Sequence, residues 1–189
     1  MAKPHLVIVC GVPGSGKSTL AHHAVQRWNA VSFASETFAD ALGADARTTS
    51  GDLSLQAVAH AYSAMGDAVG AALKTSGLVF AVGAFRSEDQ RRRFRDIAKR
   101  AGASVTVLRV SCPVDMAAER VNSRLASGER GPTSEAIGQI DATLSRASDI
   151  DVVLANEESV ENYYRQVDRL IERLLRSPDD GLSAPKASA

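Results

Sequence analysis

The sequence predicts an α/β fold in which a five-stranded parallel sheet is flanked by helices, within one domain that spans residues 1–176. Short apolar segments alternate with longer amphipathic segments along the chain, an order that is typical of a parallel sheet covered on both faces. The first apolar segment, residues 6–10, is continuous rather than alternating, as in a strand buried on both faces. A length of 189 residues with no internal repeat suits a single domain.

The boundaries of the predicted elements can be recognised along the chain. Ser35 is placed to cap a short helix, and Gly77 and Gly102 end the helices that precede the third and fourth strands. The predicted strands span residues 6–10, 31–34, 78–82, 104–110 and 151–154. The predicted helices span residues 18–28, 36–42, 53–74, 88–101, 113–127, 134–145 and 159–176. Two predicted loops and a predicted disordered tail complete the chain, at residues 43–53, 128–132 and 177–189.

Composition narrows the class of protein. Lys plus Arg and Asp plus Glu number 22 each, and this neutral balance disfavours broad electrostatic binding of nucleic acid. Cys10 and Cys112 are too few for a disulfide scaffold, so we expect both to be reduced core residues. The apolar run before the first glycine, residues 6–10, has only five residues, which is too short for a signal-peptide core or a membrane span. We therefore expect a cytoplasmic protein without a membrane partner.

Residues 11–19 match the phosphate-loop pattern G-x-x-x-x-G-K-[ST] between a predicted buried strand and a predicted helix. Glycines let backbone N–H groups turn toward phosphates, and the helix adds partial positive charge at its N-terminus. We expect Lys17 to neutralise the β- and γ-phosphates and the Ser18 hydroxyl to join the Mg²⁺ shell. The sequence therefore predicts a P-loop NTPase domain that binds ATP and Mg²⁺; a glycine-rich turn without a ligand is the minor alternative. The predicted nucleotide-binding residues of the loop are Gly11, Val12, Pro13, Gly14, Ser15, Gly16, Lys17, Ser18 and Thr19.

Segments outside this loop resemble small P-loop kinase-like proteins, the predicted kinases related to zeta-toxin-type and polynucleotide 5′-hydroxyl kinases. The resemblance extends from about Leu6 to Arg176. It implies a nucleoside-monophosphate-kinase-like core with a short lid, and transfer of a γ-phosphate to a hydroxyl group. The segments that carry it are residues 7–10, 84–86, 91–94, 108–113 and 119–124.

Two arginines are candidates for that lid. Arg120 and Arg124 are four residues apart, so they share one face of a predicted helix, and Arg130 lies just beyond it. Arginines that close over a transferring phosphate stabilise the charge spread over its oxygens. The alternative is a solvated helix in which Glu119 and Glu129 are local partners. The resemblance favours the lid, with a catalytic and nucleotide-binding role, for Arg120 and Arg124.

The acceptor side departs from the family pattern. The family usually has an Asp soon after the second strand and an Arg three residues later, where this chain has Glu36 and Ala39. Glu36 is the candidate general base and a candidate substrate contact; the alternative is a first-turn glutamate favoured by the helix dipole. The family also has an Asp at the end of the third strand, which helps to order Mg²⁺ or substrate. Val82 stands there, and the next carboxylate is Glu88.

Basic residues follow the third strand. Arg86 lies just beyond its carboxyl end, where ligands bind in open α/β sheets, and it is a candidate contact for substrate or phosphate; a solvated arginine is the alternative. The run of arginines at residues 91–93 is predicted to be a solvated helix face, with a contact to a nucleic-acid backbone as the minority interpretation.

Together these residues favour an ATP-dependent kinase that phosphorylates a hydroxyl group of a small molecule. A nucleic-acid 5′-hydroxyl kinase is a variant that the neutral charge and the missing Asp-x-x-Arg pair disfavour. Val82 and Ala39 favour the alternative, a nucleotide-binding regulatory or interaction protein with weak or lost transfer. The acceptor, the choice between ATP and GTP and the oligomeric state remain open at this stage.

Overall fold

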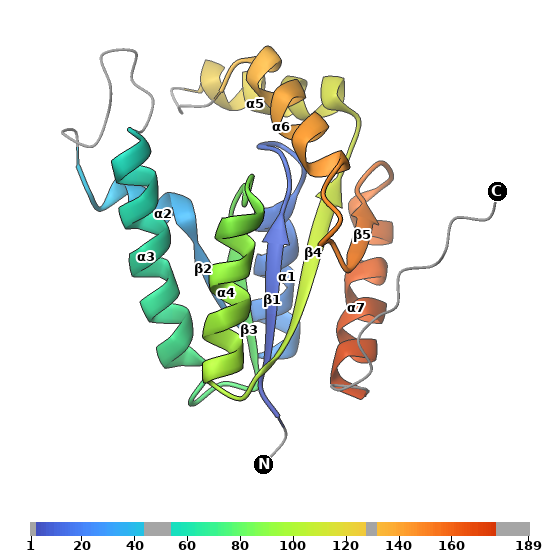
Figure 1. Ribbon diagram of the computed structural model, residues 1–189. Helices are drawn as coiled ribbons and strands as arrows, with labels where there is room; N and C mark the ends of the chain where they lie inside the picture. Colours follow the sequence, from blue (N-terminus) through green and yellow to red (C-terminus); the bar gives the residue numbers. More distant parts are fainter. Residues whose placement is uncertain (1–2, 44–53, 128–131, 177–189) are drawn as a thin grey trace.

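The predicted five-stranded parallel sheet is confirmed. The computed structural model describes residues 3–43, 54–127 and 132–176, and its strands lie in the order β2-β3-β1-β4-β5 with every neighbouring pair parallel (Figure 1). Arg130 and the predicted tail lie outside the described residues. The strands are β1 His5–Cys10, β2 Val31–Ala34, β3 Leu78–Val82, β4 Ser104–Ser111 and β5 Val152–Ala155.

The helices lie within a few residues of their predicted positions, and one predicted cap is wrong. Helix α2 begins at Ser35 itself, its N-cap position is Ala34, and no side chain caps it. The Ser35 hydroxyl is engaged elsewhere, in a hydrogen bond with Tyr62. The helices are α1 Lys17–Trp28, α2 Ser35–Asp40, α3 Leu55–Ala72, α4 Glu88–Arg100, α5 Val114–Ala126, α6 Ser134–Ser145 and α7 Val160–Arg176. Among the described residues, no helix combines the length and apolar character needed to cross a membrane.

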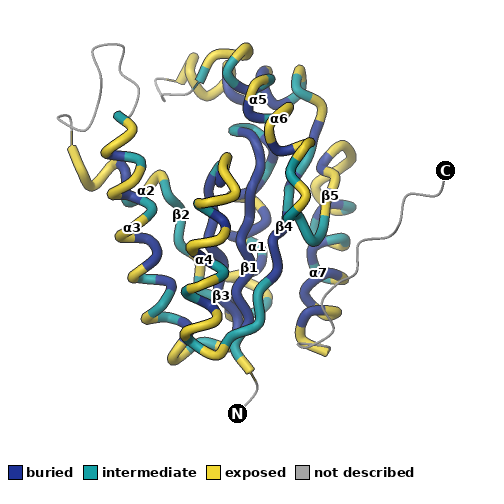
Figure 2. The backbone as a smooth tube through the Cα atoms, in the orientation of Figure 1, coloured by how far each residue is buried: buried dark blue, intermediate teal, exposed yellow. Residues whose placement is uncertain are grey.

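The core lies on both faces of the sheet, which explains the continuous apolar character of β1. Leu6 and Ile8 face one side and pack with residues of α3, α4, α5 and α6. Val7 and Val9 face the other side and pack with residues of α1 and α7. Figure 2 shows β1 buried along its length between helices that are exposed on their outer surfaces. Burial on both faces requires apolar residues at every position of the strand.

Parallel pairing brings the carboxyl ends of the central strands to one edge. Val9 of β1 pairs with Val82 of β3 and Leu108 of β4, and the Gly83 N–H donates to the Val9 carbonyl at 3.1 Å. The loop after β1 and the turn after β3 therefore lie next to each other. Figure 1 shows α5 and α6 lying across this edge of the sheet, where ligands bind in open α/β sheets.

One of the three arginines predicted to be solvated is buried. Arg91 is 2% exposed, and its Nε and Nη2 donate to the two carboxylate oxygens of Asp149 at 2.8 and 2.5 Å. Arg95 donates to the Asp149 carbonyl at 2.7 Å and to Asp151 at 3.0 Å. The solvated-face prediction is therefore wrong for Arg91, because a carboxylate far along the chain supplies its partner. Arg92 and Arg93 are exposed, as expected.

Candidate active site

The phosphate loop joins the end of β1 to the start of α1. Gly14 and Gly16 have φ angles of 84° and 102°, in the left-handed region that a residue with a side chain rarely adopts. A Cβ at Gly16 would overlap the Asn156 amide, and one at Gly14 would overlap the Ala117 carbonyl. These two glycines are therefore required both by backbone conformation and by the close approach of neighbouring segments.

Lys17 is the first residue of α1, directly after Gly16 of the loop. Its side chain is 8% exposed, and its Nζ donates to the Val12 carbonyl at 2.8 Å. Burial lowers the pKa of Lys17 to about 8, although the charge of Glu36 acts in the opposite direction. A bound polyphosphate would place negative charge beside this ammonium group and so stabilise its charged form. Ser18 and Thr19, in the first turn of α1, are exposed toward the same space.

Three side chains from distant segments hold the loop from outside. Arg120 Nη1 donates to the Gly14 carbonyl at 3.1 Å, Asn156 Nδ2 to the Ser15 carbonyl at 2.8 Å, and the Tyr163 hydroxyl to the Gly16 carbonyl at 3.1 Å. A trans peptide directs its N–H away from its C=O. The Ser15 N–H donates to the Val12 carbonyl at 3.2 Å. The Gly16 and Lys17 N–H groups point away from the side chains that hold the preceding carbonyls and are the backbone donors that an anion would meet.

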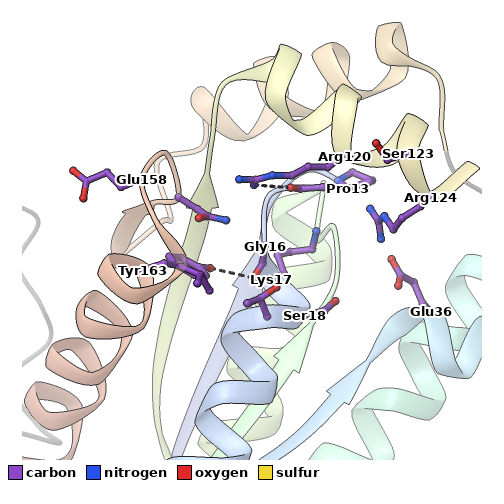
Figure 3. Close-up of a pocket in the computed structure, with 14 residues that line it drawn as sticks. Pro13, Gly16, Lys17, Ser18, Glu36, Arg120, Ser123, Arg124, Glu158 and Tyr163 are labelled. Atoms are coloured by element: carbon purple, nitrogen blue, oxygen red, sulfur yellow. Dashed lines mark hydrogen bonds between the residues drawn. The ribbon is translucent and has the colours of Figure 1, made fainter.

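A cavity of about 480 Å³ opens over the loop, a size typical of small-molecule sites. Figure 3 shows Arg124 and Glu36 pointing toward one another at one end, with Tyr163 and Glu158 at the other. Arg120 extends above Pro13 between these ends. The cavity is lined by Pro13, Gly14, Gly16, Lys17, Ser18, Thr19, Glu36, Arg120, Ser123, Arg124, Asn156, Glu158, Val160 and Tyr163.

Most of the predicted site residues meet at this cavity. Lys17, Ser18, Glu36, Arg120 and Arg124 line it together, although they come from α1, α2 and α5. Four predicted residues do not line it. Gly11, Val12 and Ser15 are buried within the loop, and Arg86 is exposed at the turn before α4.

Val82 does not line the cavity and has no polar role. It is 4% exposed and packs in the apolar cluster on the α1 face of the sheet. The carboxylate expected from the family pattern is therefore replaced by core packing. Asn156 and Tyr163, which hold the loop, had no motif to mark them; the position of Asn156 directly after β5 was the available signal.

The donor set suits Mg²⁺ bound together with phosphates. Mg²⁺ prefers oxygen ligands and usually keeps several waters beside one or two protein ligands. The exposed Ser18 hydroxyl and the Glu36 carboxylate supply oxygens in the cavity. Within residues 3–43, 54–127 and 132–176, no group of three or more His, Cys, Asp or Glu could hold a metal ion. The side chains therefore fit a magnesium–nucleotide complex in which phosphates and water complete the shell.

Solved structures with similar folds include an APS kinase and a gluconokinase. The chain has a TM-score of 0.68 and 18% identity to the APS kinase CysC of Mycobacterium tuberculosis in complex with AMPPNP and APS, covering 91% of this chain and 99% of that chain. For a gluconokinase from Sinorhizobium meliloti 1021 the TM-score is 0.66 and the identity 18%, covering 94% and 97%. For the Pnkp1/Rnl/Hen1 RNA repair complex the TM-score is 0.59 and the identity 20%, and the match covers 79% of this chain and 48% of that chain. At such identities the likeness shows the fold alone.

Sequence comparison supplies the family. No curated protein matches the chain. The model of the AAA domain family matches residues 6–147, a segment that contains the phosphate loop, Glu36 and both predicted lid arginines and spans more than half of the chain. The resemblance carried by the sequence motifs is thus confirmed, and the chain belongs to this AAA domain family, a P-loop kinase family.

Proposed function

We propose that this protein is an ATP-dependent kinase that transfers the γ-phosphate to a hydroxyl group of a small-molecule acceptor. The observation that carries the proposal is the meeting of Lys17, Glu36 and Arg124 in one cavity. Such a cavity contains a cation for the phosphates, a carboxylate for the acceptor proton and an arginine for the developing charge.

The donor side would bind ATP with its phosphates against the loop. Lys17 would contact the β- and γ-phosphates, while Ser18, the phosphates and water would hold Mg²⁺, which neutralises phosphate charge when bound. The cavity continues past the loop to Asn156, Val160 and Tyr163. This extension gives the nucleoside a partly apolar surface beside the loop.

The lid would act on the phosphate in transfer. Arg120 already lies over the loop through its hydrogen bond to the Gly14 carbonyl, while Arg124 is exposed on α5 and points toward Glu36. Cations on either side of the γ-phosphate would stabilise the charge on its oxygens as the bond to the leaving group breaks. We assign Arg120 mainly to the bound nucleotide and Arg124 to the transferring group.

The acceptor side would deliver the hydroxyl group. Its oxygen attacks the γ-phosphorus, the bond to the bridging oxygen breaks, ADP leaves, and the hydroxyl proton passes to Glu36. Glu36 is exposed at the start of α2, so the proton can continue to water. Arg86, exposed beyond β3, would contact an acceptor that extends toward α4.

The proposal is tested by measuring transfer of labelled γ-phosphate from ATP·Mg²⁺ to a panel of hydroxyl acceptors. The panel contains gluconate, other sugars, APS and an RNA oligonucleotide with a free 5′-hydroxyl. We expect at least one small acceptor to be phosphorylated by the wild type, with transfer lost in Lys17→Ala and much reduced in Glu36→Gln. Phosphorylation of the oligonucleotide alone would replace the small-molecule acceptor by a nucleic-acid end.

Val82 supports a second candidate, a nucleotide-binding regulatory protein with little transfer. An apolar residue occupies the strand end where the family pattern has a carboxylate. Under this alternative the wild type binds ATP·Mg²⁺, Lys17→Ala does not, and no acceptor is phosphorylated. The same panel, run beside a nucleotide-binding titration, therefore separates the two functions.

A further inference from the structure

The turn between β3 and α4 contains a residue in an unfavourable backbone conformation. Phe85 has a φ of 43°, in the left-handed region that costs energy for a residue with a side chain. Its N–H donates to the Tyr62 hydroxyl at 3.0 Å, and its carbonyl accepts from Arg91 Nη1 at 2.6 Å. Side chains from α3 and α4 thus hold both polar groups of the same residue.

The Phe85 ring is buried among other aromatic rings. It is 0% exposed and makes edge-on contacts with Tyr62 and Phe94, with ring centroids 5.0 Å apart in each pair. Such aromatic contacts add to the energy of burial. The surrounding packing therefore compensates for the unfavourable φ angle and keeps the turn in one conformation.

The Tyr62 hydroxyl joins this turn to a second segment. Besides accepting from the Phe85 N–H, it shares a hydrogen bond with the Ser35 side chain at the start of α2. It also lies against Gly83, where an added Cβ would be 2.7 Å from the hydroxyl oxygen and 2.9 Å from Ser35 Oγ. Glycine at this position leaves the space in which the two hydroxyls meet.

Each partner of this hydroxyl directly precedes a residue of the proposed acceptor side. Ser35 precedes Glu36, and Phe85 precedes Arg86. We propose that Tyr62 is a positioning residue that fixes Glu36 and Arg86 relative to one another through its single hydroxyl group. This inference rests on the proposed kinase function. Under this proposal the distance between Glu36 and Arg86 depends on Tyr62 of α3. No described residue of that helix lines the nucleotide cavity.

Packing of the aromatic ring alone does not explain why residue 62 carries a buried hydroxyl group. A phenylalanine would keep both ring contacts of Tyr62, with Phe85 and Phe94. A buried hydroxyl is unfavourable unless hydrogen bonds compensate its loss of water. The hydroxyl is therefore retained for the two segments that it connects.

The test is Tyr62→Phe, which removes the hydroxyl and keeps the ring. We expect amide exchange at Phe85, followed by NMR, to become about tenfold faster, the effect of losing one hydrogen bond. The KM of the acceptor found in the panel should rise about tenfold. The dissociation constant of ATP·Mg²⁺ and the exchange of the Gly16 and Lys17 amides should stay unchanged.

Two matched variants serve as controls. Thr106→Val also removes a buried hydroxyl, which bonds to His5 at 2.9 Å at the amino edge of the sheet, and should leave acceptor KM and Phe85 exchange unchanged. Tyr163→Phe removes the hydroxyl that donates a hydrogen bond to the Gly16 carbonyl. It should weaken the binding of ATP·Mg²⁺ and leave the acceptor KM unchanged.

The possible results lead to different conclusions. Faster exchange at Phe85 with an unchanged acceptor KM would reduce Tyr62 to a structural residue and overturn the proposal, as would an equal rise in the KM of ATP. If no acceptor is phosphorylated by the wild type, the kinase function fails. In that case, exchange at Phe85 and Glu36 still decides whether the hydroxyl connects the two segments, and unchanged exchange at both overturns the link itself.

Discussion

The two ends of the cavity are held by different kinds of contact. At the nucleotide end, Arg120, Asn156 and Tyr163 donate to three consecutive backbone carbonyls of one loop. On the acceptor side, Glu36 lines the cavity and Arg86 lies outside it; both are exposed, and each directly follows a residue that is hydrogen-bonded to Tyr62. Backbone that is bonded on one side presents a fixed surface on the other, whereas an exposed side chain can be exchanged. The nucleotide end is thus held through its backbone, whereas the acceptor side presents two exposed side chains.

The largest effect is expected at the nucleotide end, from Lys17→Ala. This variant removes the buried ammonium group that faces the phosphates, so both binding of ATP·Mg²⁺ and transfer should fall, the latter by about 10³-fold. Calorimetry and a transfer assay measure the two losses. Lys74→Ala, which removes an exposed lysine in the turn just after α3, is the matched control. Unchanged nucleotide affinity in Lys17→Ala would contradict the assignment of this end.

Glu36→Gln should separate the two ends. Removing the proton acceptor lowers the rate of transfer by about 10²-fold, while ATP·Mg²⁺ should bind as in the wild type because the loop is untouched. Stopped-flow transfer at saturating nucleotide measures the rate, and Glu172→Gln on α7 controls for loss of a surface carboxylate. Equal transfer by wild type and Glu36→Gln would show that another group takes the proton.

Asp149→Asn should destabilise the turn at Phe85, because Asp149 pairs with Arg91, which donates to the Phe85 carbonyl. The variant leaves a buried guanidinium without its carboxylate partner, and we expect a loss of about 2 kcal/mol in the free energy of unfolding. Urea titration measures it. Asp89→Asn, which breaks the exposed pair with Arg92, should cost much less. A similar loss in both variants would contradict the structural importance of the buried pair.

The same pair predicts a pH dependence. Burial opposes ionisation of Asp149, but the hydrogen bonds and charge of Arg91 outweigh it and hold its pKa below the usual 3.8. A carboxyl with a lowered folded pKa stabilises the fold above its unfolded pKa, and this stabilisation is lost as pH falls through the folded pKa. Wild-type stability should therefore decline below about pH 4 more steeply than that of Asp149→Asn, as followed by thermal unfolding.

Arg124→Ala is expected to have the smallest effect, about a tenfold lower rate of transfer, because Arg120 remains beside the phosphates. Nucleotide affinity should change little, since the side chains that hold the loop are those of Arg120, Asn156 and Tyr163. Arg173→Ala on the exposed side of α7 is the control. A loss of affinity as large as the loss of rate would place Arg124 with the nucleotide end.

The fold and the nucleotide end could be predicted because their signals are local. Apolar periodicity and glycine boundaries marked the elements, and the phosphate loop is a contiguous motif. Glu36 could be selected because it follows the second strand, where the family that the sequence resembles has an Asp. Burial of Arg91 could not be predicted, since its partner Asp149 lies 58 residues away, and three consecutive arginines are typical of a solvated face. The Ser35 cap was wrong for the same reason, because Tyr62 on another helix engages the hydroxyl.

The central claim is that the two ends together perform transfer. It is tested most directly by ³¹P NMR of the protein with ATP·Mg²⁺ and the acceptor panel under single-turnover conditions. The account predicts that the γ-phosphate resonance disappears while ADP and a phosphomonoester resonance of one acceptor appear together. Bound ATP that stays intact, or inorganic phosphate as the sole product with every acceptor, would contradict it.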